Sequence, residues 1–407
     1  MDAALSFTRR DFLGAAAVAA GTQVLPSPLA AAEVQAAQGE SLLAPGLTYL
    51  NTASLGPTSR SVLNRTLEAW YELETNPVRM SYGEGAVHVA TDRVRDQTAA
   101  FLGCDTNDIL LTRSTTDAMN NIALGMRLST GDHVVTTDQE HHGGADCWRY
   151  LARRRGIIID VVPIAPTDRN AKVIVDRFAS AITPATRVIS VSHVLTSTGL
   201  RMPVTELSAL ARARGILCVV DGAQAAGQIA VDVKALKCHA YAACGHKWLM
   251  APKGTGMLYV SPDAVDAIAP IQWQDTKRYV AGSTGIGSLP LVLGLGAAIE
   301  RANARGIADI ERRVMELREY TIAQLTRVRD VSVLSAPAGP MASALVAVLL
   351  PTRVDSQALQ TAMRDKHGIM VKLVEKQWFN GIRISPHIFN TEADIDRAVS
   401  ALRTELQ

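Results

Sequence analysis

The 407-residue sequence has few aromatic residues and almost no excess of charge of either sign. Phe, Trp and Tyr make up 5% of it, and 41 basic residues stand against 39 acidic ones, a formal net charge of +2. Nucleic-acid-binding proteins normally have a basic excess or a cluster of Lys and Arg, and disordered chains have fewer apolar residues than the 48% found here. The composition therefore predicts a folded protein without a nucleic-acid partner.

Cysteine is also scarce, and no apolar run is long enough to span a membrane. A membrane-spanning helix needs about 20 consecutive apolar residues. The five cysteines are odd in number and show no CxxC or Cys/His ligand spacing: Cys104, Cys147, Cys218, Cys238 and Cys244. The sequence therefore indicates neither a disulfide framework nor a zinc site.

The N-terminus has the pattern of an export signal. Arg9 and Arg10 precede Phe12, Leu13 and an alanine-rich segment, and small residues near Ala30 offer a cleavage site. The alternative is an amphipathic or disordered tail, but paired arginines before such a segment are typical of the twin-arginine (Tat) signal. We expect residues 1–32 to be a Tat signal peptide, the Tat export machinery to be a partner, and the protein to be periplasmic. Because this route exports folded proteins, we also expect a cofactor.

Beyond residue 40, short β-rich runs alternate with segments of helical period. Near-continuous apolar strands separated by helices predict an α/β fold with a mostly parallel seven-stranded sheet covered by helices on both faces. The predicted strands are Ile109 to Thr112, His133 to Thr137, Ile157 to Ile164, Arg187 to Ser192, Leu217 to Asp221, Ala240 to Cys244 and Met257 to Val260.

The same pattern divides the chain into parts. An N-terminal arm is expected at 33–60, a large domain at 61–288 and a smaller C-terminal α/β domain at 289–407. The small domain is predicted to begin with one long helical segment from Leu289 through Leu317, to contain strands near 331–334 and 344–350, and to end in a helix from Glu392 to Leu406. Ligands bind at the carboxyl ends of parallel strands, so the residues after each strand are the informative ones.

Asp221 and Lys247 each follow a predicted buried strand, and 26 residues separate them, which fits one crossover unit. Such a pair can be a structural ion pair. A second interpretation is chemical. A lysine that binds pyridoxal phosphate (PLP) as a Schiff base needs a carboxylate to keep the pyridine nitrogen protonated. Asp221 and Lys247 are the residue types that this role requires.

The flanking motifs resemble those of the class V aminotransferases of PLP fold type I, the group that includes cysteine desulfurases, isopenicillin N epimerase and kynureninase. DGAQ at 221–224, GHKW at 245–248 and PKGTG at 252–256 carry the resemblance. Further motifs follow in the family's order across nearly the whole chain after the signal: YLNTASLGP at 49–57, LTRSTTDAMN at 111–120, EHHGG at 140–144, SHVLTSTGL at 192–200 and RISPHIFNTEADID at 383–396. The resemblance implies PLP as cofactor.

It also implies roles for individual residues around the ring of the cofactor. Lys247 is similar to the Schiff-base lysine, Asp221 to the partner of the pyridine nitrogen, and Gln224 to the donor that contacts the phenolic oxygen. His141 resembles the histidine that stacks on the ring and takes part in proton transfer, and Thr196 stands at a position beside the cofactor.

At the phosphate end the expected residues are hydroxyl donors and a helix N-terminus. Thr115 and Thr116 precede a helical run, so they can bind a phosphate, although Ser and Thr there also act as ordinary N-caps. His246 and Cys244 match phosphate-side positions, but a thiol is a weak donor. Ser283 replaces a threonine that in relatives reaches the phosphate of the partner subunit, which implies a homodimer with shared active sites.

At the substrate end, Arg383 matches the arginine that binds the α-carboxylate, a role suited to a planar, permanently charged group. A structural salt bridge is the alternative. Asn51, in the N-terminal arm, is a further candidate. Cysteine desulfurases carry a nucleophilic cysteine shortly before this arginine, whereas no cysteine follows Cys244 here.

The sequence therefore predicts an exported, homodimeric PLP enzyme that acts on the amino group of an amino acid or peptide-derived metabolite. Aminotransfer is the favoured reaction. An epimerase like isopenicillin N epimerase and a C–S or C–N lyase are the alternatives, as is a PLP-fold scaffold that only binds a partner.

Overall fold

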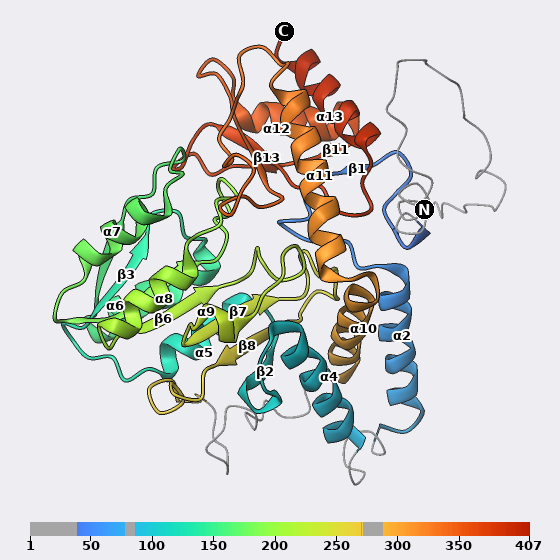
Figure 1. The fold of residues 1–407 in the computed structure, drawn as a ribbon. Coiled ribbons are helices and arrows are strands. Elements are labelled where there is room, and N and C mark those ends of the chain that lie inside the picture. The colour runs from blue at the N-terminus through green and yellow to red at the C-terminus, as the bar shows by residue number, and fades with distance from the viewer. Residues whose placement is uncertain (1–38, 78–85, 270, 272–287) are drawn as a thin grey trace, which may run out of the picture.

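The central feature of the fold is a seven-stranded sheet. The computed structural model describes residues 39–77, 86–269, 271 and 288–407 (Figure 1). Only β8 runs against its neighbours, so the sheet is mostly parallel, as predicted. The strand order is β2 (Ile109–Thr112), β8 (Gly256–Val260), β7 (Ala240–Cys244), β6 (Leu217–Asp221), β5 (Thr186–Ser192), β3 (His133–Thr137) and β4 (Ile158–Val162).

Helices cover both faces of this sheet, because successive strand residues are apolar on both sides. In β6, Cys218 and Val220 pack into one core and Val219 into the other. Helices α5 (Thr115–Gly125) and α6 (His142–Arg155) bury their apolar faces in the core that contains Val219. The opposite core contains α4 (Ala86–Leu102), α7 (Ala171–Ala181) and α8 (Val204–Ala213), and the remaining elements of this part are α2 (Arg60–Thr75), η1 (Thr106–Asp108) and α9 (Val233–Leu236).

The C-terminal part forms a second, smaller α/β unit. Its antiparallel sheet has the order β12 (Lys372–Leu373), β13 (Gly381–Ile384), β10 (Val346–Leu349) and β9 (Ser332–Val333). Helices α11 (Ile307–Leu325), α12 (Ser356–His367) and α13 (Glu392–Glu405) pack with this sheet in a separate core. The N-terminal arm joins this unit, because β1 (Thr48–Tyr49) pairs in parallel with β11 (Ile369–Met370).

The prediction of one long helical segment at the start of the small domain is wrong. The long helical segment from Leu289 is two helices, α10 (Leu289–Arg305) and α11, separated by Gly306. Gly306 has φ 86°, a left-handed conformation that favours glycine and ends α10. In Figure 1, α10 lies beside α2 and α4 of the large part, while α11 leads into the small unit.

Several predictions concern residues outside the described part. The signal peptide at 1–32 and Ser283 both lie there.

Among the described helices, none is long and apolar enough to cross a membrane. The boundaries of the arm and the two domains stay predictions.

Candidate active site

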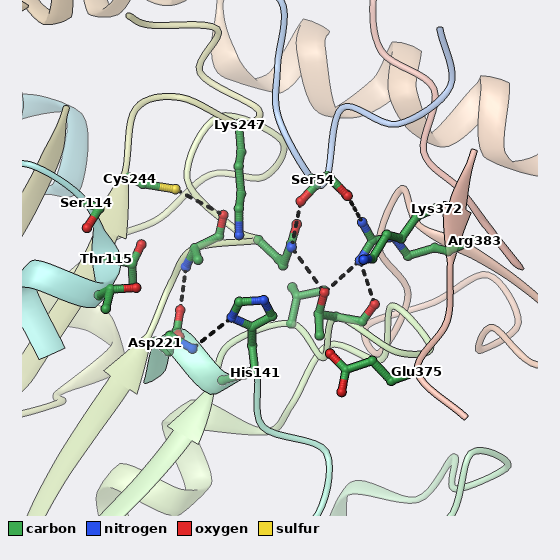
Figure 2. Close-up of a pocket in the computed structure, with 18 of the residues that line it drawn as sticks. Ser54, Ser114, Thr115, His141, Asp221, Cys244, Lys247, Lys372, Glu375 and Arg383 are labelled. Carbon is green, nitrogen blue, oxygen red and sulfur yellow. Dashed lines mark hydrogen bonds between the residues drawn. The ribbon is translucent and has the colours of Figure 1, made fainter. Parts of the chain in front are cut away.

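A cavity of about 280 Å³ lies where the parallel strands end and the small unit meets the large one. Ten of the predicted site residues line it: Thr115, Thr116, His141, Thr196, Asp221, Gln224, Cys244, His246, Lys247 and Arg383. In Figure 2, Ser114 and Thr115 lie at one end, Arg383 and Lys372 lie at the other, and Lys247, His141 and Asp221 lie between them. The fold therefore brings together residues that are up to 268 positions apart.

Asp221 is the last residue of β6, and Lys247 follows β7, the next strand in the sheet. Burial raises the pKa of the Asp221 carboxyl, while an N–H from Ala223 at 2.9 Å and the nearby charge of Lys247 oppose the shift. A Cβ on Gly144 would lie 2.4 Å from Asp221 Oδ2, so only glycine lets the start of α6 approach this carboxylate. A positively charged partner would favour the ionised form of Asp221.

His141 is the N-cap of α6, and its ring lines the cavity. Its Nδ1 accepts the backbone N–H of Gly143 at 3.0 Å, so the neutral ring carries its hydrogen on Nε2. Desolvation and the charge of Lys247 lower the pKa of His141 to about 4. His141 is therefore neutral at pH 7. The adjacent His142 turns to the surface, where it pairs with Asp146 and Glu375.

The end of the cavity that contains Ser114 and Thr115 has the features of an anion-binding site. Helix α5 begins there, and the Ser114 side chain caps it by accepting the N–H of Asp117 at 3.1 Å. Thr115 Oγ1 is buried without a nitrogen or oxygen partner, and His246 Nδ1 is buried with no hydrogen-bond partner. A helix N-terminus with unused polar atoms beside it fits a phosphate dianion.

Cys244 lies at the same end. Its thiol contacts the carbonyl oxygen of Ala223, with a sulfur to oxygen distance of 3.9 Å. Burial raises the pKa of this thiol, so it remains protonated at neutral pH. Cys244 can therefore contribute at most a weak hydrogen bond to a phosphate.

Arg383 extends from β13 into the cavity and is 2% exposed. Its Nη1 donates to Thr196 O at 2.8 Å and to Thr196 Oγ1 at 2.6 Å, and its Nη2 donates to Ser54 Oγ at 3.0 Å. Burial lowers the pKa of Arg383 to about 10, which still leaves it charged at pH 7. No carboxylate forms an ion pair with it among the described residues, so the predicted alternative of a structural salt bridge finds no partner there.

Gln224 and Thr196 connect the two ends of the site. Gln224 Nε2 donates to Ala53 O at 2.9 Å and to Thr196 Oγ1 at 3.3 Å, and its Oε1 accepts the indole N–H of Trp248 at 2.9 Å. Both amide hydrogens of Gln224 are thus engaged. A contact with the phenolic oxygen of a cofactor requires Gln224 to release one of them.

Asn51 is not among the lining residues. It forms a β-bridge with Ser385, and its buried Oδ1 has no hydrogen-bond partner. The cavity is also lined by three residues that the sequence did not predict, Ser54, Lys372 and Glu375. Nothing in their local sequence could have identified them, because their place depends on how the arm and the small unit pack on the large sheet.

The residues present fit PLP. Asp221 would hold the pyridine nitrogen, Lys247 would carry the covalent link, His141 would cover the ring, and the start of α5 would hold the phosphate. Bound PLP supplies an electron sink for negative charge at a substrate carbon.

Known proteins resemble the chain over most of its length. Residues 48–398 match the model of the family "Aminotransferase class-V". An isopenicillin N epimerase of Amycolatopsis lactamdurans is 31% identical over 89% of this chain and 96% of its own. A cysteine desulfurase of Pectobacterium atrosepticum is 29% identical over 88% of this chain and 92% of its own.

Solved structures agree on the fold. A C-DES variant with glycine covalently linked to its PLP cofactor superimposes with a TM-score of 0.80 at 22% identity, and the match covers 88% of this chain and 97% of C-DES. The seven-stranded, mostly parallel sheet with its helices is that of PLP fold type I. The chain belongs to the class V aminotransferase family, and its cofactor is pyridoxal phosphate.

Proposed function

We propose that this class V aminotransferase-family enzyme is an aminotransferase that removes the amino group of an α-amino acid and leaves a keto acid. Bound PLP would stabilise negative charge at the α-carbon of the substrate. The reaction then depends on groups that hold the substrate carboxylate and move one proton, and the cavity offers both.

Arg383 is the proposed site for the α-carboxylate. Its guanidinium is buried and charged, and it is fixed by Thr196 and Ser54. Its Nε is buried and has no hydrogen-bond partner, so a donor remains for a carboxylate. A planar guanidinium suits this ligand, and a buried charge gains most from a matching one.

Lys247 is the proposed base: its Nζ would accept the α-proton and would pass it to the bound cofactor on the same side, rather than back to the α-carbon. The observation that carries this proposal is the state of His141, toward which Lys247 points across the cavity in Figure 2. His141 has a pKa of about 4 and an Nδ1 engaged by Gly143, so at pH 7 it holds no readily released proton. Epimerisation needs a proton donor on each face of the α-carbon. A single amine suffices for aminotransfer.

The test is a single turnover in the absence of any keto acid acceptor. With α-amino acid in excess, the holoenzyme should form one keto acid per active site and then stop. Addition of an acceptor keto acid should restart turnover. Lys247→Ala should form none, while Lys253→Ala, which removes a nearby lysine that does not line the cavity, should behave as the wild type.

Epimerisation is the second candidate, because the relative named isopenicillin N epimerase matches 89% of this chain at 31% identity. The same experiment in deuterium oxide separates the two reactions. Inversion at the α-carbon with deuterium incorporation, and no keto acid, would reject aminotransfer in favour of epimerisation.

We also propose that the enzyme is exported by the Tat route to the periplasm and works there as a homodimer. Arg9 and Arg10 before an alanine-rich segment support export, and Ser283 at a position that reaches a partner's phosphate in relatives supports the dimer. Changing both arginines to lysine should leave the precursor in the cytoplasm. Normal periplasmic accumulation of that variant would contradict the proposal for export, and a monomeric holoenzyme in sedimentation would contradict the dimer.

A further inference from the structure

A second cation stands beside Arg383 in the cavity. Strands β12 and β13 are antiparallel, and Lys372 is the residue directly opposite Arg383. Side chains at such positions lie on the same face, with Cβ atoms about 5 Å apart, and like charges there are destabilising. Both residues line the same cavity (Figure 2). Desolvation and the charge of Arg383 lower the pKa of Lys372, which is consistent with this proximity.

No acidic residue of the described part forms an ion pair with Lys372, although the negative charge of Glu375 opposes the lowering of its pKa. Its Nζ has no carboxylate within the 4.0 Å that defines an ion pair there. The acid nearest in sequence that lines the cavity is Glu375, and its Oε2 is occupied elsewhere. It lies 3.5 Å from His142 Nε2 and accepts a hydrogen bond from Gln377 Nε2 at 2.9 Å. The fold thus keeps two adjacent cations that form no ion pair with an acid of the described part, and the charge of Glu375 offsets that of Lys372 only in part.

The two cations lie at different depths. Arg383 is 2% exposed and is held by Thr196 and Ser54, whereas Lys372 is exposed at the rim. Trp378 also lines the cavity and offers apolar surface to methylene groups. A substrate with its α-carboxylate on Arg383 would therefore direct its side chain toward the rim that Lys372 occupies.

We propose that the substrate is an amino acid whose side chain carries a second carboxylate, and that Lys372 binds this carboxylate and sets the specificity. The inference rests on the proposed function in one respect, the binding of the α-carboxylate by Arg383. It adds the chemical class of the substrate, because a substrate with a neutral side chain would place no negative charge beside Lys372.

The test compares acidic amino acids with neutral ones of similar size. The holoenzyme is assayed with aspartate, glutamate and 2-aminoadipate against asparagine, glutamine and norleucine. At least one acid should have a KM about fivefold lower than its neutral counterpart, the upper range for an exposed ion pair. Lys372→Met should remove this preference and change the KM of the neutral amino acids less than twofold.

Two further variants make the result specific. Lys376→Met removes an exposed lysine of the same segment that does not line the cavity, and it should leave the preference unchanged. Glu375→Gln removes a negative charge from the rim and should strengthen the preference rather than weaken it. Calorimetric titration with succinate, glutarate and adipate, each against the monocarboxylate of equal length, measures the same selectivity without turnover.

The outcomes separate this inference from the proposed function. Equal weakening of all amino acids by Lys372→Met would mean that Lys372 shares the α-carboxylate, and it would overturn the inference. Turnover of neutral amino acids with no preference for any acid would also overturn it and leave aminotransfer standing. Dicarboxylate binding that depends on Lys372 without any keto acid formation would support the Lys372 site and reject the proposed reaction.

Discussion

Glu140, next to His141, is a partly buried acid beside the active site, and its ionisation should affect stability. Its Oε1 accepts from Thr137 Oγ1 at 2.7 Å, and its Oε2 accepts from Ser192 Oγ at 2.6 Å. Burial raises the pKa of Glu140 from 4.5 to about 7, and the negative charge of Asp221 contributes to this increase. The two hydrogen bonds lower the pKa but do not offset the effect of burial. The native protein therefore binds this proton more tightly than the unfolded chain does.

The sign of the pH dependence follows from this difference. The stabilising effect of the proton is fully present below about pH 4.5 and is lost as the pH rises to about 7. A pKa change of this size corresponds to about 3 kcal/mol of unfolding free energy. Glu140→Gln cannot ionise and keeps most of the shape. The free energy of unfolding of Glu140→Gln relative to wild type should therefore rise by about 3 kcal/mol from pH 4.5 to pH 8.

Urea unfolding of wild type and variant at a fixed excess of PLP, followed by tryptophan fluorescence at pH 4.5, 6, 7 and 8, measures this difference. Infrared spectroscopy should also detect the protonated carboxyl of Glu140 below pH 6. Glu405→Gln is the matched control with the opposite sign. Hydrogen bonds from His367 and Lys366 lower the pKa of Glu405, so its contribution is lost as pH falls. A difference between Glu140→Gln and wild type that does not change from pH 4.5 to 8 would refute the reasoning.

Three other predictions concern the site. After borohydride reduction, peptide mapping should find the cofactor on Lys247, and an adduct on another lysine would contradict the assignment. Gly144→Ala would bring a Cβ to 2.4 Å from Asp221 Oδ2, and overpacking of this kind costs about 1–3 kcal/mol. PLP affinity, measured by equilibrium dialysis, should fall by at least tenfold, and unchanged affinity would argue against close packing there. Cysteine should yield no persulfide, because burial keeps the Cys244 thiol protonated and no cysteine follows it; release of alanine and persulfide in repeated turnovers would contradict this.

The sequence predicted the sheet, and it predicted that Asp221 and Lys247 lie at the same edge of that sheet, because both features depend on local signals. Strands β6 and β7 begin and end at the predicted residues. Each is continuously apolar and is followed by polar residues, which fixes its end. Since parallel strands end at one edge, placing Asp221 and Lys247 after neighbouring strands already placed them in one cavity.

The rest depended on packing over long distances. Arg383 and Thr196 are 187 residues apart in sequence, and no local pattern indicates that their side chains meet. The position of Lys372 opposite Arg383 is set by the register of β12 and β13, and β12 is only 2 residues long. The break at Gly306 was missed because the helical period continues on both sides of it, while one left-handed residue suffices to end α10.

The hydroxyl of Thr196 joins the substrate end of the site to the cofactor end. It accepts from Arg383 Nη1 at 2.6 Å and from Gln224 Nε2 at 3.3 Å, and Gln224 in turn accepts from Trp248, one residue after Lys247. A hydroxyl oxygen has two lone pairs, so both acceptor positions are used. If Gln224 turns one amide hydrogen toward the phenolic oxygen of PLP, Thr196 can bind Arg383 alone. Cofactor binding would then change the hydrogen bonding of Arg383, the proposed site for the substrate carboxylate, without movement of either strand.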